Sequence, residues 1–382
     1  MLVGGGVFVA PDGNLRTDMD LTSPRRVGKS DLYVTPLGFG GGTIGNPNVP
    51  NGTSLDTVVA AWGTGVRFFD TAPWYGLGRS ERRLGLALSG IDHRDGYCIN
   101  TKVGKSLVPE PQRHERKRTL SPGGDVRTPR DPVTGFRVEF DYTYQRIRSQ
   151  HHESLQRLGH SRVDSLTIHD IDYGYHQPGQ IEKHLEELDP NGGRGATALH
   201  ELRSQGAIKA IGCGCNLESR NADSWLTSAH EDLCERIADL VDLDFFVIAG
   251  GYTLLETRAL RRVLTLCEQR DLGVIIAAPF ASGWLVDEDG RGSYMYDQAP
   301  VDIVEKTRHM VNVCNAHNVS LAAVALQFPL AHPAVAAVIP GAKSPNEPKQ
   351  NRDYLMTPIP PNLWQTLKDE GLLDPDAPTP HS

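Results

Sequence analysis

The sequence predicts an α/β protein that closes as a (β/α)8 TIM barrel, with a long insertion after the third strand. Eight short apolar runs recur along the 382 residues, and longer segments of helical periodicity lie between them. These runs are apolar along their whole length, which is typical of parallel strands covered by helices on their outer side. A single closed barrel also suits a chain of this length.

Each predicted strand is a β-branched or aromatic run, and the segment after it repeats its apolar residues about every three to four positions. We expect strands at 37–39, 67–70, 97–102, 165–169, 210–214, 245–249, 274–278 and 336–339. We expect helices at 54–63, 80–89, 144–158, 196–204, 219–239, 257–270, 301–317 and 346–354, the last in spite of its proline.

The chain is expected to consist of an N-terminal extension at 1–35, a barrel at 36–360 and a C-terminal tail at 361–382. The extension is expected either to cover the bottom of the barrel or to stay loose, and the Asp- and Pro-rich stretch at 374–382 predicts disorder. Residues 105–141 form an insertion rich in Pro, Gly and Arg. Since the insertion follows a strand, we expect it over the carboxyl end of the barrel, where barrel enzymes have their sites.

The composition limits the kinds of partner that the protein is expected to bind. A net charge of −8 gives no overall attraction to nucleic acid, so the basic run at 113–118 is interpreted as a solvated loop. No export signal and no run of 18 apolar residues occur, so no membrane association is expected. The six cysteines form no CxxC pair, and Cys213 and Cys215 are interpreted as packing residues of one strand. We expect a cytoplasmic protein that binds a small molecule, and homo-oligomerisation stays open.

Four polar residues lie at or just after the ends of three adjacent predicted strands: Asp70, Tyr75, Lys102 and His169. Each one alone has an ordinary structural interpretation, such as a turn cap, a rim residue or a buried imidazole. Their grouping favours a function, because the carboxyl ends of barrel strands surround one mouth.

The chemistry of these four side chains explains the grouping. A phenol has a pKa of about 10, and a nearby ammonium group lowers it. Lys102 supplies that charge for Tyr75, and Asp70 holds Lys102 in place. His169 can bind a substrate oxygen. Such a phenol can exchange a proton with an alcohol or a carbonyl while hydride moves, and hydride transfer requires a nicotinamide cofactor.

Three motifs resemble the aldo-keto reductase superfamily: "GVRFFDTAPWYGLGRSERRLGLAL", "YCINTKVG" and "ESLQRLGHSRVDSLTIHD". The segments "GGYTLLE", "APFASGWL" and "VIPGAKS" resemble its sugar and pyridoxal dehydrogenase branch, which includes L-fucose and D-threo-aldose 1-dehydrogenases. The resemblance implies that Asp70, Tyr75, Lys102 and His169 form a catalytic tetrad, with Tyr75 as the general acid and base.

The resemblance also implies a set of cofactor-binding residues. Asn216 would bind the nicotinamide carboxamide, although Cys215 and Ala249 stand where better known reductases have Ser and Gln. Phe280 would contact the nicotinamide, with a core aromatic as the alternative. The loop with Ser282 and Gly283 would pass close to the pyrophosphate, and the last loop would hold the adenosine end through Gly341, Lys343, Glu347 and Asn351.

The last loop bears on the choice of cofactor. The resemblance implies that NADP-specific members carry Lys and Arg at the positions of Gly341 and Glu347. A carboxylate repels a 2'-phosphate and accepts hydrogen bonds from a ribose diol, so we expect NAD, with NADP as the alternative that Lys343 favours.

The sequence therefore predicts an NAD(P)-dependent oxidoreductase that oxidises a hydroxyl of a sugar or sugar-like substrate, for example an aldose to a lactone. The alternatives are an NADPH-dependent carbonyl reductase and a non-catalytic nucleotide-binding scaffold. The stretch "HDID" (169–172) has metal-like spacing, but no second cluster accompanies it, so no metal is expected.

Overall fold

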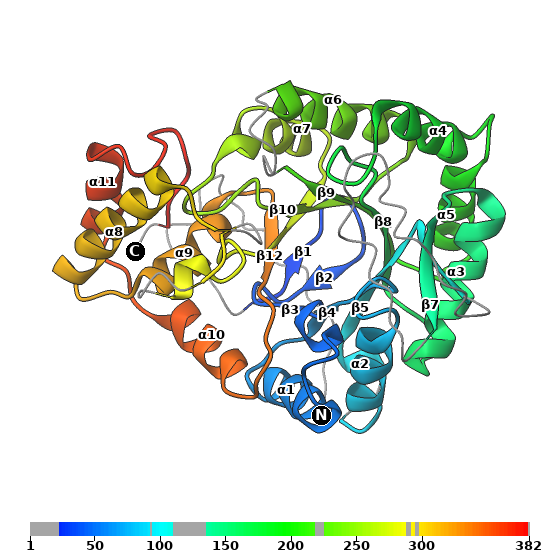
Figure 1. Ribbon diagram of the computed structural model, residues 1–382, viewed down its shortest axis with the longest axis horizontal. Coiled ribbons are helices and arrows are strands. Elements are labelled where there is room, and N and C mark those ends of the chain that lie inside the picture. Colours follow the sequence, from blue (N-terminus) through cyan, green and yellow to red (C-terminus); the bar gives the residue numbers. More distant parts are fainter. Residues whose placement is uncertain are drawn as a thin grey trace, which may run out of the picture.

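The structure is a computed structural model that describes residues 23–91, 94–109, 135–217, 225–287, 292–294 and 298–380. Figure 1 shows its strands inside a ring of helices. The eight barrel strands are all parallel and follow one another around the sheet in chain order. They are β3 (Phe39–Gly40), β4 (Phe68–Asp70), β5 (Cys98–Val103), β8 (Ser165–His169), β9 (Ala210–Asn216), β10 (Phe245–Ala249), β11 (Gly273–Ala277) and β12 (Val335–Ile339).

Two isolated parallel bridges join the first and last barrel strands. Leu37 pairs with Val338, and Gly40 pairs with Gly341. The predicted (β/α)8 barrel is therefore confirmed, and all eight predicted strands are present.

Eight helices overlap their predicted positions, although α7 begins six residues late and the predicted start of α6, 219–224, lies outside the described residues: α1 (Asn51–Gly63), α2 (Arg79–Ser89), α3 (Tyr144–Leu158), α5 (Gly195–Ser204), α6 (Trp225–Leu240), α7 (Val263–Gln269), α8 (Val301–Ala316) and α10 (Glu347–Met356). Three further helices were not predicted: α4 (Pro178–Leu188), α9 (Leu321–Gln327) and α11 (Pro361–Asp369). Every residue of α9 is buried, so its sequence has no polar face that could show a helical period.

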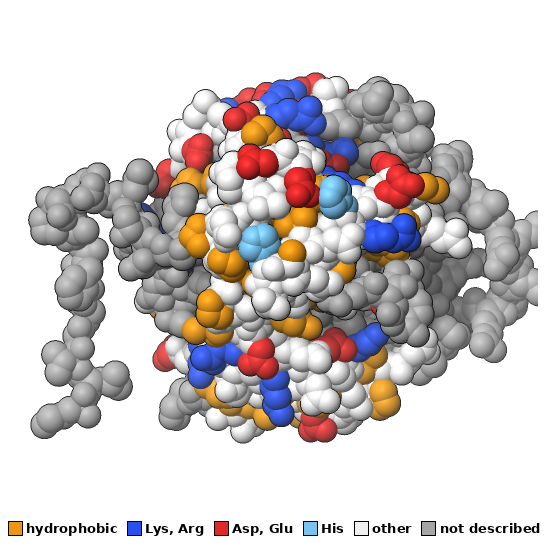
Figure 2. All heavy atoms as spheres, turned by 90° about the vertical axis from the view of Figure 1, so that its left-hand side faces the viewer, with side chains coloured by type: hydrophobic (Ala, Val, Ile, Leu, Met, Phe, Trp, Pro, Cys, Tyr) orange, Lys and Arg blue, Asp and Glu red, His pale blue; other side chains and the backbone are white. Residues whose placement is uncertain are grey.

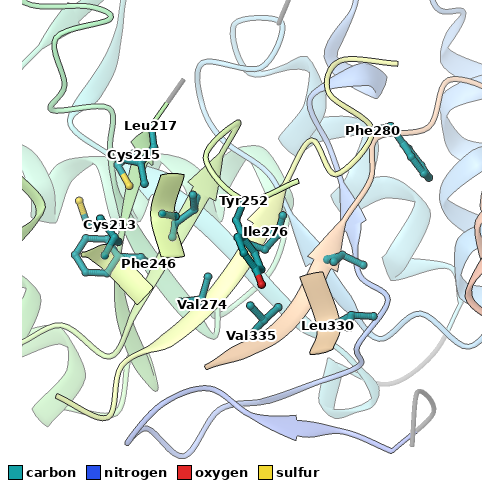
Figure 3. Close-up of a cluster of buried hydrophobic side chains, with 14 of the residues drawn as sticks. Cys213, Cys215, Leu217, Phe246, Tyr252, Val274, Ile276, Phe280, Leu330 and Val335 are labelled. Carbon is teal, nitrogen blue, oxygen red and sulfur yellow. The ribbon is translucent and has the colours of Figure 1, made fainter. Parts of the chain in front are cut away.

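The core has two layers. The larger layer lies between the strands and the helices, and the smaller one fills the inside of the barrel around Phe68 and Phe245. Cys213 and Cys215 point to the same side of β9 in Figure 3 and belong to the larger layer. The pKa of both thiols is raised well above the usual value, that of Cys213 mainly by burial and that of Cys215 by a side-chain hydrogen bond with Cys234 and by burial. Their interpretation as packing residues is confirmed.

A hairpin of β1 (Arg25–Arg26) and β2 (Tyr33–Val34) covers the amino end of the barrel. Its apolar residues Val27, Leu32 and Val34 join the inner core layer. Gly28 has a φ of +52°, and a Cβ there would lie 2.4 Å from the carbonyl oxygen of the residue that precedes β10. Of the two expectations for the extension, the first is therefore confirmed for residues 23–35.

The two ends of the insertion pair with each other. β6 (Lys105–Pro109) and β7 (Phe136–Phe140) form an antiparallel ladder that begins with Lys105 opposite Phe140. Leu107 and Val138 of this ladder pack on Leu77, in the loop after β4. The insertion therefore starts and ends beside the carboxyl end of the barrel, as expected, and its residues 110–134, including the basic run, lie outside the described residues.

The prediction of disorder at 374–382 is wrong for residues 374–380, and residues 381–382 lie outside the described residues. Helix α11 packs against α8, and Leu372, Leu373 and Ala377, which follow α11, are buried in the large core layer. Figure 2 shows acidic and basic side chains interspersed on the outer face over α8 and α11, with hydrophobic side chains scattered between them. Among the described residues, no helix combines the length and the apolar character needed to cross a bilayer.

Candidate active site

A buried ion pair lies at the carboxyl ends of β4 and β5. Lys102 Nζ donates to both carboxylate oxygens of Asp70 at 2.7 Å and to the backbone oxygen of Thr71 at 2.9 Å. Asn100 Nδ2 donates to Asp70 Oδ1 at 2.7 Å. Both charged side chains are almost completely buried, so this network satisfies the ammonium group with three acceptors instead of water.

The loop after β4 places Tyr75 above this pair. Gly76, Leu77 and Gly78 all have positive φ, of 63°, 51° and 85°, which turns the chain sharply into α2. A Cβ on Gly76 would lie 1.8 Å from the carbonyl oxygen of Gly45. The glycines of this stretch therefore hold the tyrosine loop against the first barrel loop.

The structure brings the predicted tetrad together. Lys102 Nζ lies 4.9 Å from the centre of the Tyr75 ring. The rings of Tyr75 and His169 meet edge to face, with centres 5.8 Å apart. Three adjacent strand ends therefore direct Asp70, Tyr75, Lys102 and His169 into one place.

His169 is buried at the end of β8. Burial lowers the pKa of its imidazole well below the usual value, which favours the neutral form. Its Nε2 lies 3.3 Å from Asp170 Oδ2, and its Nδ1 is buried with no hydrogen-bond partner among the described residues. A neutral imidazole with one nitrogen left for a ligand can bind a substrate oxygen.

Sequence reasoning missed a second buried lysine beside the tetrad. Lys105 Nζ pairs with Asp170 Oδ2 at 2.5 Å, and its side chain is fully buried. The ammonium group lies 3.6 Å from the ring centre of Tyr175 and 4.2 Å from that of Trp74. The one available signal was the position of Lys105 three residues after Lys102, at the start of the insertion.

Asn216, the predicted nicotinamide-binding residue, ends β9. Its Nδ2 donates to Asp170 Oδ1 at 3.0 Å and to Asp172 Oδ2 at 2.7 Å. Burial acts to raise the pKa of Asp170, but its interactions with His169 and Lys105 outweigh burial and hold this pKa at about 2. Burial, followed by the charge of Asp170, raises the pKa of Asp172 to about 7.

These contacts explain the "HDID" stretch. Its carboxylates bind Lys105 and Asn216, and the described residues contain no group of three or more His, Cys, Asp or Glu side chains arranged around a metal. Asp170 and Asp172 are therefore functional candidates that sequence reasoning considered only as metal ligands.

The loop after β11 has an unusual backbone. Ala281, Ser282 and Gly283 have φ values of 48°, 64° and 103°. Ser282 Oγ is buried and has no hydrogen-bond partner among the described residues. Phe280 packs on Tyr354 of α10, with ring centres 6.4 Å apart, and lies apart from the other labelled side chains in Figure 3. This contact fits the core alternative for Phe280, and the orphaned hydroxyl of Ser282 fits a ligand-binding loop.

The last predicted cofactor residues follow β12. The carboxylate of Glu347 accepts a hydrogen bond from the backbone N–H of Lys343 at 2.9 Å. Gly341 approaches the first barrel loop so closely that a Cβ would lie 2.4 Å from a threonine hydroxyl. Asn351 is buried and lines a cavity of about 10 Å³ between α1 and α10, which has room for about one water molecule at most.

The fold and the site together define a barrel enzyme with a proton-transfer site at the carboxyl end of its strands. The chain belongs to the aldo/keto reductase family, whose family model matches residues 36–369. It is therefore an NAD(P)-dependent oxidoreductase, and the family resemblance of its motifs is confirmed.

Two characterised relatives are similar over nearly the whole chain. A D-threo-aldose 1-dehydrogenase of Pseudomonas is 35% identical and covers 91% of this chain and 96% of its own length. A pyridoxal 4-dehydrogenase of Microbacterium luteolum is 34% identical and covers 91% of this chain and 97% of its own length. Among solved structures, an aldo-keto reductase of Bacillus halodurans has the same fold, with a TM-score of 0.66 at 21% identity over 92% of this chain and 97% of its own.

Proposed function

We propose that this oxidoreductase removes hydrogen from a hydroxyl group of a sugar or sugar-like substrate, giving a lactone from an aldose. The observation that carries the proposal is the position of Lys102, whose ammonium group binds Asp70 and lies 4.9 Å from the ring centre of Tyr75. The similarity to an aldose dehydrogenase over nearly the whole chain supports the substrate class.

In this proposal Tyr75 accepts the proton of the anomeric hydroxyl. The ammonium group of Lys102 lies 4.9 Å from the ring centre of Tyr75, where its charge attracts the negative charge that develops on the phenol, and Asp70 holds Lys102 in place. The neutral imidazole of His169 holds the substrate oxygen beside the phenol. When bound, the nicotinamide cofactor accepts the hydride, which no protein side chain can do.

The described residues fit a nicotinamide dinucleotide. The orphaned hydroxyl of Ser282 and the left-handed backbone of Ala281 to Gly283 suit a loop that closes on a pyrophosphate. Asn216 presents a fixed amide next to His169, which suits the carboxamide end, and Phe280 is the aromatic side chain closest in sequence to this loop. Gly341, Lys343, Glu347 and Asn351 are proposed to hold the adenosine end.

We further propose that NAD⁺ is preferred over NADP⁺. Glu347 places a carboxylate at the start of α10, where it accepts bonds from the backbone of Lys343 and the hydroxyl of Ser344. A carboxylate there repels a 2'-phosphate and accepts hydrogen bonds from a ribose diol. Steady-state kinetics with both cofactors tests this proposal, and a preference for NADP⁺ of about tenfold or more contradicts it.

The substrate class is tested by a panel of aldoses, polyols and pyridoxine vitamers with NAD⁺ and NADP⁺, followed by the absorbance of the reduced nicotinamide. We expect the highest kcat/KM with an aldose, and a lactone as the product. Aldehydes and ketones with NADPH form the opposing set. A kcat/KM for carbonyl reduction that exceeds every oxidation by about tenfold or more contradicts the proposed reaction.

We also propose that the enzyme works in a reducing compartment such as the cytosol. No disulfide links any of the six cysteines, and five of them are buried. A thiol titration of the denatured, freshly isolated protein should therefore find six reactive groups. Isolation with disulfide-bonded cysteines would contradict this location.

A further inference from the structure

One carboxylate lies between the two halves of the site. Asp170 directly follows β8, and its Oδ2 contacts Lys105 Nζ at 2.5 Å and His169 Nε2 at 3.3 Å. Its Oδ1 accepts a hydrogen bond from Asn216 Nδ2 at 3.0 Å. The same side chain therefore touches the imidazole expected to hold the substrate and the amide expected to hold the nicotinamide.

Asp170 is held in an unfavourable backbone conformation. Its φ of 52° lies in the left-handed region, which costs free energy for a residue with a side chain. The residue is only 7% exposed, so its carboxylate is turned into the protein instead of into water. A backbone cost and a desolvation cost at one residue indicate that its position matters for a reason other than local stability.

Lys105 fixes the carboxylate from the other side. The side chain comes from β6, the first strand of the insertion ladder, and it is fully buried. The ring faces of Tyr175 and Trp74 surround the ammonium group. These rings restrict the ammonium group to a small volume, so Asp170 has a rigid counter-ion rather than a mobile surface lysine.

Asn216 depends on this carboxylate for its orientation. Its Nδ2 donates to Asp170 and Asp172, so the amide can point its nitrogen only toward these carboxylates. Directly opposite Asn216 in the neighbouring strand is Ala249, which has no side-chain polar group to share this task. Cys215, which precedes Asn216 in β9, points into the apolar layer between the strands and the helices.

We propose that Asp170, anchored by Lys105, is a positioning residue that fixes both the imidazole of His169 and the amide of Asn216. The inference rests on the proposed function, which gives His169 and Asn216 their ligands. Because one carboxylate orients both groups, a change at Lys105 or Asp170 alters substrate turnover and cofactor binding together. If His169 and Asn216 were held by two separate residues, one substitution would alter substrate turnover or cofactor binding alone.

The decisive variants separate the misplacement of His169 and Asn216 from a loss of protein stability. K105M leaves Asp170 without its counter-ion, and we expect kcat/KM to fall about 10- to 100-fold through misplacement of the reacting groups. K105M/D170L removes both charges, and replacing a buried pair by apolar side chains restores much of the stability. We expect this double variant to regain its melting temperature and to keep the low kcat/KM. K105R retains the charge and is expected to restore most of the activity that K105M loses.

Cofactor binding is measured without turnover, by titrating each variant with NADH and following the nicotinamide fluorescence. We expect the Kd of NADH to rise about three- to tenfold in K105M/D170L and in the isosteric variant D170N, because Asn216 loses its fixed orientation. D170N changes no side-chain volume, so it serves as the second test if the double variant fails to fold.

The matched control lies at the other end of the same strand. Arg94 pairs with Asp164, which directly precedes β8, at 2.6 Å, and Asp164 is buried. R94M should lower the melting temperature and leave kcat/KM and the Kd of NADH within about twofold of wild type.

A folded K105M/D170L or D170N protein with kcat/KM and NADH Kd within about twofold of wild type overturns the inference, since Asp170 would then be only structural. The proposed function fails by a different result, the absence of NAD⁺ or NADP⁺ reduction by wild type with every sugar tested. The NADH titrations still decide the role of Asp170 in that case.

Discussion

The two ends of the barrel both bury carboxylates beside the strands, but they use them differently. At the amino end, Asp164 and Asp244 each directly precede a strand. Asp164 accepts a hydrogen bond from the backbone N–H of Ile99 at 2.9 Å, and Asp244 accepts one from that of Ile211 at 2.8 Å. Each also pairs with an arginine that reaches solvent. These carboxylates tie one strand's backbone to the next.

At the carboxyl end, the buried carboxylates bind side chains instead. Asp70 binds Lys102, and Asp170 binds Lys105, with both lysines almost completely buried. Lys102 in turn lies over the ring of Tyr75, and Asp170 itself lies beside the imidazole of His169. The comparison teaches that burial of a charge does not by itself identify a functional residue. What separates the two ends is whether the carboxylate binds the backbone of a neighbouring strand or a buried lysine beside the predicted catalytic residues.

The largest effect on kcat is expected from Tyr75, the proton-transfer residue, which lies at the carboxyl end of the barrel. Tyr75→Phe removes the group that exchanges the proton, so kcat should fall by about 10² to 10⁴. The fold and the Kd of NADH should change little, since the ring remains. The exposed Tyr33 of the amino-end hairpin offers the control: Tyr33→Phe should leave kcat unchanged. A Tyr75→Phe enzyme with kcat within about threefold of wild type would remove the basis of the comparison.

A large loss of stability without loss of turnover is expected from the amino end. Asp244→Ala leaves the N–H of Ile211 and the guanidinium of Arg203 without their buried acceptor, and should lower the free energy of unfolding by about 2–4 kcal/mol. Denaturant unfolding measures the loss, and kcat is measured where the variant is folded. A fall in kcat of more than about threefold would show that the amino end also influences the chemistry.

The pH dependence of stability sharpens the comparison at the carboxyl end. Asp172 keeps its proton in the folded state up to about pH 7, whereas the unfolded chain releases it near pH 4. The folded state therefore binds more protons in this range, and Asp172 makes stability decline as the pH rises from about 4 to 7. The free energy of unfolding of Asp172→Asn, taken relative to that of wild type, should therefore be higher at pH 8 than at pH 5 by roughly 2 kcal/mol. Equal differences at both pH values would contradict the raised pKa.

The smallest effect is expected away from both ends, in α3. His151 is buried, and both of its ring nitrogens lack hydrogen-bond partners among the described residues. Burial lowers its pKa to about 4, so the unfolded chain takes up a proton first as the pH falls below about 6.5, and stability is lost. His151→Leu should stabilise the protein more at pH 5 than at pH 8, by about 1 kcal/mol. We expect the ratio of the variant's kcat to that of wild type to be the same at both pH values.

Much of the fold could be predicted because the barrel strands are short, apolar and regularly spaced. All eight strands and the tetrad were found this way, since parallel strands place their carboxyl ends around one mouth. α9 was missed because its seven residues are all buried and show no period. Residues 374–382 were expected to be disordered because of their Asp and Pro content, yet Ala377 packs in the core.

The candidate cofactor residues were predicted less directly. Asn216 was placed at the end of β9 by its motif, but its bonds to Asp170 and Asp172 bring together residues of two strands. Lys105 was not recognised, because a lysine in a Pro- and Arg-rich insertion resembles a surface residue. Only the ladder between β6 and β7 brings it into the site.

The sequence alone determined the barrel, its strand order and the four polar side chains at its mouth. These follow from periodicity and from short-range spacing along the chain, which local physics controls. The tertiary structure decided which buried charges meet, such as Lys105 with Asp170 across 65 residues, and which apolar segments of the tail are covered. Pairings of this kind depend on desolvation and on distance in space, and both exist only when distant segments pack together.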